Sequence, residues 1–238
     1  MNYLENKTAL VTGASSGIGY EIVKYISKFN MKIIVTARRE NNLNQLKKEV
    51  ENNSNSEVII LVKDLATPES PQEIYDFCLS NNLQVDFLVN NAGYGFTSDF
   101  DTYDLNKLDD FMNVLLNSLV KLTRLFLKDM KERKSGKILQ VSSIAGIIPS
   151  GSGAIGIYGN IKNFINEFTI TLNSTYKKFN IDICALCPGF TETGFNERAG
   201  FNMQYSDVPS PFLMSAKDVA IQGVNAVSYT HLRAHETQ

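Results

Sequence analysis

A glycine-rich turn near the N-terminus constrains the fold of this chain more than any other feature. The segment Thr12–Gly19, Thr-Gly-Ala-Ser-Ser-Gly-Ile-Gly, follows the apolar run Ala9–Val11 and precedes a stretch with helical apolar periodicity. A strand, a turn and a helix N-terminus in this order bring backbone N–H groups and the positive end of a helix dipole together, and glycine lets an anion approach them. The segment predicts a site for the pyrophosphate of a dinucleotide, with an ordinary structural turn as the alternative.

Short apolar runs alternate with helical stretches along the whole chain. Strands are expected at 7–11, 32–36, 57–62, 86–89, 137–142 and 181–187. Helices are expected at 17–29, 40–53, 69–81, 106–133, 157–178 and 216–226. This alternation predicts an α/β fold of the Rossmann type, a doubly wound parallel sheet flanked by helices. A length of 238 residues, 43% of them hydrophobic, suits a single domain with a closed core.

Composition excludes several classes of partner. The net charge is -2 and there is no basic block, so we expect no nucleic-acid surface. We expect no signal peptide and no membrane span, because no apolar run approaches ~18 residues; a cytoplasmic protein is the expectation. Cys184 and Cys187 lie three apart on one expected strand and point to opposite faces, so we expect neither a disulfide nor a metal site.

The C-terminal residues have an unusual character. Val227–Thr237 resembles the translation of a sequencing adapter, so we expect a domain at 1–226 and a non-native tail at 227–238; a natural tail is the alternative. Both histidines of the chain, His231 and His235, fall in this tail. A histidine-dependent mechanism is therefore not expected.

Polar motifs follow three of the expected strands. Asn90–Gly93 follows the strand at 86–89, Ser142 and Ser143 follow 137–141, and Pro188-Gly189 follows 181–187. Each motif alone is typical of a turn. Ligands of open α/β sheets bind outside the carboxyl ends of the strands, so the joint placement of the motifs indicates one site.

With these residues in view, the chain resembles the short-chain dehydrogenase/reductase family over residues 5–226. Five signatures occur in family order: the glycine turn, Asp64-Leu65, Asn90–Gly93, Ser143 with Tyr158-x-x-x-Lys162, and Pro188–Thr193. The resemblance implies an NADP(H)-dependent or NAD-dependent oxidoreductase. It also implies a domain that continues into a further strand, so we expect the C-terminal strand to be missing from this chain.

The resemblance assigns catalytic roles to four residues. Tyr158 is expected to be the general acid in carbonyl reduction, and Lys162 to bind the nicotinamide ribose as well. Ser143 is expected to hold the substrate oxygen, with Ser142 as the alternative. Asn117 is expected to support a water-linked proton relay, or else to be a plain polar helix residue.

Spacing bears on two of these assignments. Four Tyr-x-x-x-Lys patterns occur, but only Tyr158/Lys162 follows the serine-bearing strand. Their spacing puts both side chains on one helical face, where the cation is expected to lower the pKa of the phenol. Ser143 and Tyr158 lie about two residues further apart than is usual in the family, with the extra length in the flexible loop 150–156. Such insertions cost little, so the residues are expected to assemble.

The end of the second expected strand bears on the choice of cofactor. Ala37 stands where an acidic residue would bind the adenosine ribose of NAD, and Arg38 follows it. A guanidinium suits the 2′-phosphate of NADP(H), which is the predicted cofactor; a solvated Arg38 is the alternative. By resemblance, the cofactor contacts are expected from Gly13, Ser15, Ser16, Gly17, Ile18, Gly19, Arg38, Asp64, Leu65, Asn91, Ala92, Gly93, Tyr158, Lys162, Pro188, Gly189, Thr191 and Thr193.

The expected substrate loop, 190–214, is rich in aromatic residues and methionine, so an apolar lid and a substrate with an apolar portion are predicted. Arg198 is expected to face water, with contact to a substrate anion as the alternative. The predicted function is NADP(H)-dependent interconversion of a carbonyl and an alcohol. The alternative is a non-catalytic NADP(H)-binding regulatory protein on the same fold.

The resemblance also implies a homodimer or homotetramer, formed through the helices at 106–133 and 157–178. The first of these carries an apolar stripe: Leu108, Met112, Leu115 and Leu119. These side chains either form a subunit interface or pack on the sheet.

Overall fold

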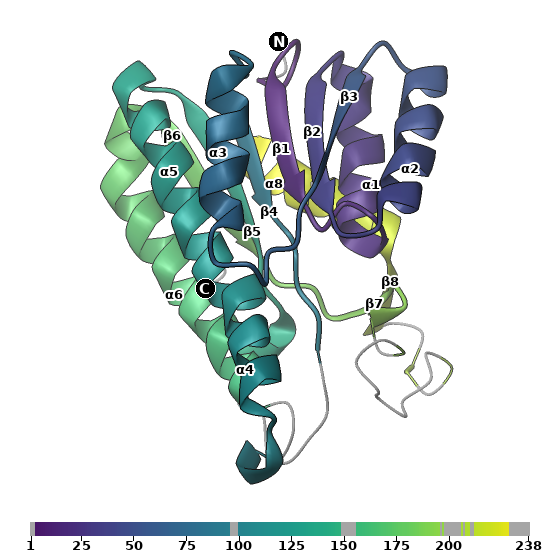
Figure 1. Cartoon of the computed structure of the whole chain (residues 1–238), viewed down its shortest axis with the longest axis vertical. Coiled ribbons are helices and arrows are strands. Elements are labelled where there is room, and N and C mark those ends of the chain that lie inside the picture. Colours follow the sequence, from purple (N-terminus) through teal and green to yellow (C-terminus); the bar gives the residue numbers. More distant parts are fainter. Residues whose placement is uncertain are drawn as a thin grey trace, which may run out of the picture.

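In the computed structural model, a parallel sheet of six strands runs through the centre of the molecule (Figure 1). The structure describes residues 3–95, 100–148, 156–195, 197, 206, 208–209 and 212–228. The strands are β1 (Thr8–Thr12), β2 (Lys32–Ala37), β3 (Glu57–Val62), β4 (Phe87–Asn90), β5 (Gly136–Val141) and β6 (Ile181–Leu186). Their order is β3-β2-β1-β4-β5-β6, which confirms the expected Rossmann-type fold. The order reverses between β1 and β4, and a ligand crevice is expected at the carboxyl ends there.

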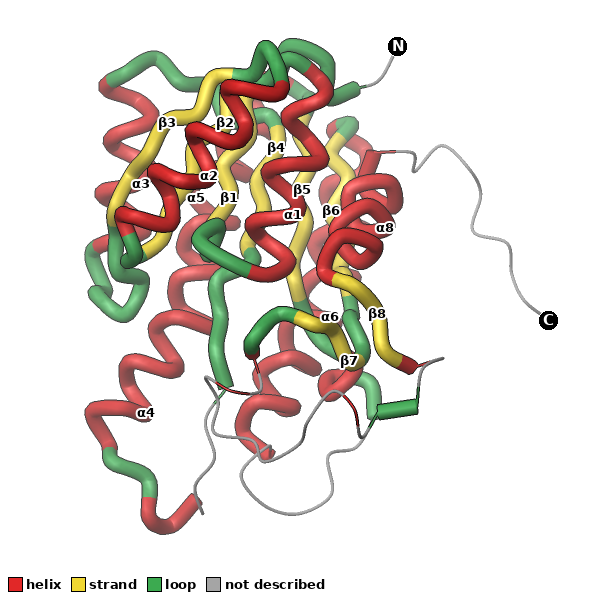
Figure 2. The backbone as a smooth tube through the Cα atoms, turned by 90° about the vertical axis from the view of Figure 1, so that its right-hand side faces the viewer, coloured by secondary structure: helices red, strands yellow, loops and turns green. Residues whose placement is uncertain are grey.

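Helices cover both faces of the sheet (Figure 2). They are α1 (Gly17–Ile26), α2 (Glu40–Asn53), α3 (Ser70–Ser80), α4 (Leu105–Met112), α5 (Ser118–Arg133), α6 (Gly156–Tyr176) and α8 (Ala216–Ser228). One face carries α1, α2 and α8, and the other carries α3, α5 and α6 (Figure 1). Among the described residues, no helix has the length and apolar character needed to cross a membrane.

Alternate residues of the central strands fill two separate cores. Val11 and Val35 belong to the core beneath α1, α2 and α8, whereas Leu10 and Ile34 belong to the core beneath α3, α5 and α6. All four are fully buried. Strands buried on both faces have continuous apolar sequences, and each such side chain contributes about 1.5–3 kcal/mol by leaving water. This is why short apolar runs located the strands so well.

The helix expected at 106–133 is interrupted in its middle. Residues Asn113–Asn117 form a π-helical segment between α4 and α5. Leu115 and Leu119 are 1% and 5% exposed and pack in the core against the sheet, so they are not available to an interface. The side of the helix that carries them faces the sheet, which decides between the two interpretations of the apolar stripe for these residues.

Two further features lie toward the C-terminus. Strands β7 (Phe190–Glu192) and β8 (Leu213–Ser215) form a second, two-stranded parallel sheet. Helix α8 continues through Val227, which is fully buried, and ends at Ser228. The expected domain boundary at residue 226 therefore falls inside a helix, and residues 229–238 lie outside the described part of the chain.

Candidate active site

The glycine turn joins β1 to the N-terminus of α1. Gly13 and Gly17 have φ of +66° and +61°, values that favour glycine. Ser16 is the N-cap of α1 in an extended conformation, and its side chain makes no capping hydrogen bond; the first turn of α1 contains no acidic residue. The first N–H groups of α1 thus face outward without a side-chain cap, and the site fits a bound anion.

Asn91 joins the end of β4 to this turn through hydrogen bonds. Its Nδ2 donates to the carbonyl oxygens of Thr12 and Gly13 at 2.9 and 3.2 Å. In return, the Thr12 hydroxyl accepts from the N–H groups of Asn91 and Ala92 at 2.9 and 3.0 Å. A Cβ added to Gly19 would lie 2.3 Å from Asn91 Nδ2, so only glycine leaves room for this amide. The side chain of Asn91 thus orders the backbone of the expected cofactor site.

Replacing Gly19 by alanine is expected to lower the free energy of unfolding by about 2 kcal/mol, because the new methyl group displaces the Asn91 amide. The higher helix propensity of alanine offsets part of this cost. Dye-reported thermal unfolding measures the effect. The matched control is Gly189→Ala, since a Cβ at Gly189 meets nothing within 4 Å. Equal melting temperatures for the two variants would contradict the prediction.

Three of the four expected catalytic residues come together beyond the ends of β4 and β5. Tyr158 and Lys162 lie one turn apart on α6, and the Ser143 hydroxyl forms a hydrogen bond with the Tyr158 hydroxyl. The Lys162 ammonium lies 5.4 Å from the centre of the Tyr158 ring. The longer spacing between Ser143 and Tyr158 therefore does not keep the two hydroxyls apart; residues 149–155 of the intervening loop lie outside the described residues.

Ser142 and Ser143 face different surroundings. The Ser142 hydroxyl is buried and donates to the carbonyl oxygen of Lys162 at 2.9 Å. Ser143 is only partly buried, and its hydroxyl also accepts from the N–H of Ala145 at 3.2 Å. The geometry brings Ser143, rather than Ser142, to the phenol.

The ionisation of Tyr158 differs from the expectation. Burial raises the pKa of its phenol to about 12, and the hydrogen bond from Ser143 lowers that pKa by a smaller amount. The expected lowering of the pKa by Lys162 is wrong for this structure, because the ammonium lies over the ring and donates to the carbonyl oxygen of Val141 at 2.8 Å. Tyr158 is consequently protonated at neutral pH and able to donate a proton.

Lys162 is a buried cation, only 5% exposed. Burial lowers the pKa of its ammonium to about 8, and the nearby Cys187 opposes this shift weakly. Among the described residues, no carboxylate forms an ion pair with it. Two donor positions beyond the bond to Val141 suit a ligand that brings hydroxyl groups.

Asn117 lies at the end of the π-helical segment, on an exposed position. Its Nδ2 donates to Asn113 Oδ1 at 2.8 Å, and Asn113 in turn donates to the carbonyl oxygen of Ala66 at 3.1 Å. The hydrogen bonds of the described residues do not join Asn117 to the other three expected catalytic residues. π-helical segments recur at functional sites, and this one ends at Asn117.

The two arginines after β2 make different contacts. Arg38 is the expected phosphate ligand; its side chain is 68% exposed and lies 3.8 Å from a carboxylate oxygen of Asp64. Arg39 donates to the hydroxyls of Ser15 and Ser16, at 2.9 and 2.8 Å. Arg39 thus reaches the glycine turn. The sequence pattern indicated Arg38 alone as a phosphate ligand. The only sign of the Arg39 contact in the sequence is that a second arginine directly follows Arg38.

The segment after β6 spans the site. A Cβ on Gly17 would lie 3.1 Å from the side chain of Thr193, so Thr193 lies against the glycine turn. The ring of Phe195 lies 5.8 Å from that of Tyr158. The carbonyl oxygen of Pro188 accepts from the N–H of Ile144 at 2.8 Å, which ties this segment to the turn that carries Ser143.

The remaining cofactor candidates have local roles. Leu65 is buried in the core beneath α3, and Ile18 packs on the opposite core. Thr191 is buried, and its hydroxyl donates to the carbonyl oxygen of Gly189 at 3.0 Å.

Arg198 and the expected lid residues Phe201, Met203 and Tyr205 lie outside the described residues. The described cysteines are free, and no group of described residues is arranged to hold a metal ion.

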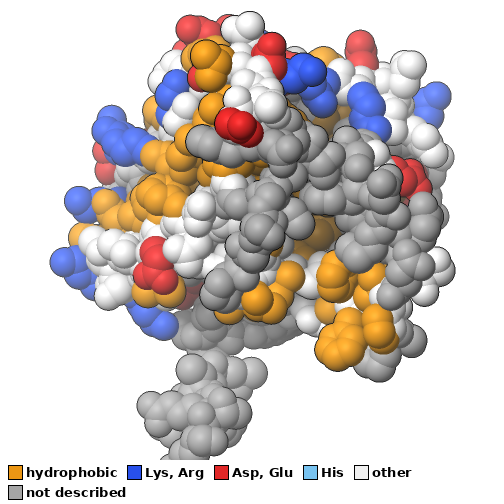
Figure 3. Space-filling view, turned by 90° about the horizontal axis from the view of Figure 1, so that it is seen from below, with side chains coloured by type: hydrophobic (Ala, Val, Ile, Leu, Met, Phe, Trp, Pro, Cys, Tyr) orange, Lys and Arg blue, Asp and Glu red, His pale blue; other side chains and the backbone are white. Residues whose placement is uncertain are grey.

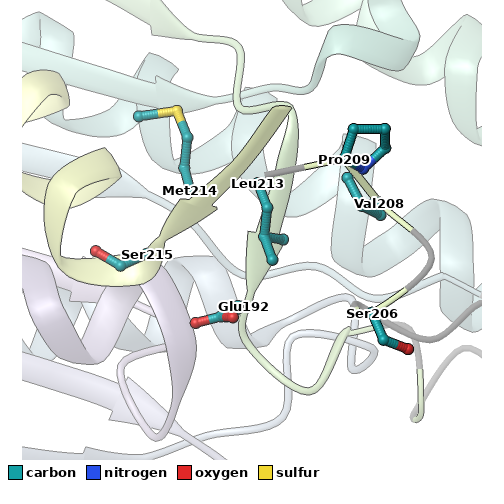
Figure 4. Close-up of a pocket in the computed structure, with 7 residues that line it drawn as sticks. All are labelled: Glu192, Ser206, Val208, Pro209, Leu213, Met214 and Ser215. Atoms are coloured by element: carbon teal, nitrogen blue, oxygen red, sulfur yellow. The ribbon is translucent and has the colours of Figure 1, made fainter. Parts of the chain in front are cut away.

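A cavity of about 440 Å³ lies beside the small sheet of β7 and β8 (Figure 4). Its lining residues are Glu192, Ser206, Val208, Pro209, Leu213, Met214 and Ser215. The catalytic candidates are not among them. Large hydrophobic side chains are also exposed near this end of the sheet, with Ile147, Phe190 and Phe212 at 60%, 43% and 67% exposure. Figure 3 views this end and shows hydrophobic side chains gathered in several groups.

Comparison with known proteins decides the family. Residues 7–203 match the family model described as short chain dehydrogenase. The chain is a member of the short-chain dehydrogenase family. The glycine turn and the grouping of Ser143, Tyr158 and Lys162 fit this membership.

Curated relatives of this short-chain dehydrogenase include very-long-chain 3-oxoacyl-CoA reductases. The chain is 34% identical to the one from Anas platyrhynchos over 191 residues, 78% of this chain and 60% of the relative. It is 30% identical to the one from Homo sapiens over 223 residues, 90% of this chain and 69% of the relative. The chain therefore spans about 60–70% of the length of these relatives.

Solved structures support the fold. A short-chain dehydrogenase from Sphingobium yanoikuyae in complex with NADPH has a TM-score of 0.84 at 23% identity, covering 92% of this chain and 84% of its own. L-Sorbose reductase from Gluconobacter frateurii, complexed with NADPH and L-sorbose, has a TM-score of 0.81 at 25% identity, covering 94% and 90%.

Proposed function

We propose that this short-chain dehydrogenase interconverts a carbonyl compound and an alcohol, with NADP(H) as cofactor and Tyr158 as the acid. The observation that carries the proposal is the grouping of Ser143, Tyr158 and Lys162 beside the glycine turn. The buried, protonated phenol suits the reductive direction at neutral pH, because it has a proton to give.

Each residue of the group has a task in this reaction. NADPH, when bound, supplies the hydride. The Ser143 hydroxyl orients the substrate oxygen toward Tyr158, and the Tyr158 hydroxyl gives that oxygen its proton. Lys162 holds the ribose hydroxyls of the cofactor with the donor positions that Val141 leaves free. Asn117 is proposed to support the return of a proton from solvent, which suits its exposed position.

The substrate is proposed to have an apolar portion. Exposed hydrophobic side chains near the site, among them Phe190 and Phe212, support this, as does the likeness to very-long-chain 3-oxoacyl-CoA reductases. A 3-oxoacyl thioester is therefore the first substrate class to examine. Hydrophobic ketones and aldehydes come next, and a sugar ketone such as L-sorbose is the polar contrast.

The deciding experiment combines ligand binding with turnover. Dye-reported unfolding is recorded with saturating NADPH, NADH or neither, since the chain has no tryptophan to report binding. A ligand at a hundred times its Kd stabilises the folded chain by ~2.7 kcal/mol. A larger rise in melting temperature with NADPH, and NADPH oxidation with an apolar carbonyl, are expected. Binding without turnover of any carbonyl would favour a regulatory protein instead.

Preference for NADPH is expected to rest on both arginines after β2. Arg39→Ala and Arg38→Ala should each weaken NADPH binding by about 10-fold or more, because each removes a cation beside the expected 2′-phosphate; a hydrogen bond to a charged group contributes about 1.5–3 kcal/mol. Kd values from titration measure the effect. NADH binding should change little, and Arg124→Ala, at an exposed position on α5, is the control.

Equal weakening of NADPH and NADH binding by either arginine variant would show that the guanidinium orders the glycine turn and does not read the phosphate. The distinction matters most for Arg39, because Arg39 donates hydrogen bonds to Ser15 and Ser16 within that turn.

Association and location complete the proposal. A homodimer or homotetramer is proposed to form through the exposed side of α6, where Phe164 and Ile170 are 44% and 62% exposed. Light scattering coupled to size-exclusion chromatography measures the mass. A cytoplasmic location is proposed from the sequence alone.

A further inference from the structure

The residues Ser142–Gly146, here called the serine turn, are held from two sides. The Ile144 N–H donates to the carbonyl oxygen of Pro188 at 2.8 Å, on the side of β6. On the side of α6, the carbonyl oxygen of Gly146 accepts from two amide side chains: Asn163 Nδ2 at 3.0 Å and Asn166 Nδ2 at 3.3 Å. Both amides lie on the helix that carries Tyr158 and Lys162.

Gly146 touches the backbone of α6 directly. A Cβ at this position would lie 2.5 Å from the carbonyl carbon of Lys162 and 2.7 Å from the nitrogen of Asn163. The serine turn therefore rests on α6 without an intervening side chain, and the two amides fix its carbonyl there. The Ser142 hydroxyl ties the first residue of the turn to the Lys162 carbonyl oxygen, and the two amides tie its last residue to α6, so the turn is fixed on the helix at both ends.

Asn166 makes a second connection. Its Oδ1 accepts from the Cys187 thiol at 3.3 Å, directly before Pro188. One amide side chain thus joins α6, the serine turn and the segment that leads to Thr193. Since Ser143 and this segment border the same site, Asn166 links the two loops to the catalytic helix.

The position of Ser143 depends on this arrangement. Ser143 lies three residues before Gly146 in the same short turn, and its hydroxyl must stay within hydrogen-bond reach of Tyr158. A misplacement of ~1 Å in a catalytic group can cost on the order of 100-fold in rate. We propose that Asn163 and Asn166 are positioning residues that hold Ser143 at the phenol by anchoring the Gly146 carbonyl. The proposal rests on the proposed function.

The test is the double variant Asn163→Ala/Asn166→Ala. Its kcat is expected to fall by about 10-fold or more, with KM for NADPH within about twofold of the wild-type value, because the glycine turn is untouched. The hydrogen bond from Ser143 lowers the pKa of Tyr158, so its loss should also shift the pH profile of alcohol oxidation to higher pH. The matched control is Asn173→Ala on the same helix, whose Oδ1 accepts from the Ile183 N–H at 3.0 Å, in contact with β6 rather than the serine turn.

A second readout does not depend on turnover. Removing Asn166 takes away the hydrogen-bond acceptor of the Cys187 thiol, so alkylation of Cys187 by iodoacetamide, located by mass spectrometry, should be several-fold faster in the double variant than in Asn173→Ala. If the wild-type chain turns over no carbonyl compound, the proposed function fails, while this rate still tests the anchoring. If the double variant does not fold, kcat and the pH profile are measured on Asn163→Ala alone, which lies at an exposed position, and alkylation of Cys187 is measured on Asn166→Ala alone.

The proposal is overturned if the double variant keeps its kcat within twofold of the wild-type value. It is also overturned if kcat falls without a shift in the pH profile, or falls equally in Asn173→Ala. Unchanged alkylation of Cys187 would show that Asn166 does not hold the two loops.

Discussion

Replacing Tyr158 by phenylalanine should lower kcat for carbonyl reduction by about 100-fold to 10,000-fold, the usual contribution of a positioned general acid. The variant keeps the ring that packs against Phe195 and loses only the hydroxyl that Ser143 contacts. Because the glycine turn and Lys162 are intact, the rise in melting temperature with NADPH should persist. Initial rates of NADPH oxidation and thermal unfolding measure the two quantities.

Tyr20→Phe is the matched control for that experiment. Tyr20 begins another Tyr-x-x-x-Lys pattern, and its hydroxyl donates to Glu49 rather than to a serine. Its kcat should stay within about twofold of the wild-type value. A Tyr158→Phe enzyme as fast as wild type would refute Tyr158 as the acid.

Replacing Lys162 by methionine should raise the free energy of unfolding at pH 7 by about 2 kcal/mol. The pKa of Lys162 falls from its usual 10.5 to about 8 in the folded chain, so keeping the ammonium charged there costs about 3 kcal/mol, and loss of the bond to Val141 offsets about 1 kcal/mol of the gain. The melting temperature should rise by roughly 4–8 °C. NADPH binding and turnover should weaken sharply, which is the expected trade-off at a functional site.

The stability difference between Lys162→Met and the wild-type chain is expected to depend on pH. Between pH 8 and 10.5 the folded wild-type chain binds fewer protons at Lys162 than the unfolded chain, so its stability rises with pH across that interval. The advantage of Lys162→Met should therefore shrink as pH rises. Lys24→Met, whose ammonium pairs with Glu49 at 2.7 Å on the surface, should show no such advantage. A Lys162→Met variant less stable than wild type at pH 7 would contradict the argument.

The comparison of these two lysines shows what spacing can and cannot predict. Lys24 and Lys162 lie 5.7 and 5.4 Å from the ring centres of Tyr20 and Tyr158, so the local geometry of the pattern is nearly the same. The difference is tertiary: Lys24 pairs with glutamate on the surface, whereas Lys162 is buried. Chain order after the serine-bearing strand selected the second pattern, but the resulting burial, which reverses the expected pKa effect on Tyr158, depends on the packing of α6.

The fold itself followed from local patterns, since buried parallel strands are apolar throughout. The π-helical segment at Asn113–Asn117 had no such signal, because its composition fits an α-helix equally well. The contact of Arg39 with Ser15 was missed for a similar reason. Which of two adjacent arginines turns toward the glycine turn depends on how α2 begins, and the sequence does not specify that direction.

Because β7 pairs with β8, the substrate specificity of the enzyme can change without a change in its catalytic residues. Phe190 pairs with Leu213 and Glu192 with Ser215, so the chain between these strands leaves and re-enters the domain at one fixed place. Each doubling of the length of a loop with anchored ends costs only about 0.6 kcal/mol. The number of residues between Phe195 and Phe212 can therefore change during evolution while Ser143, Tyr158 and Lys162 stay where they are. New substrates would then be acquired without rebuilding the residues that carry out the reaction.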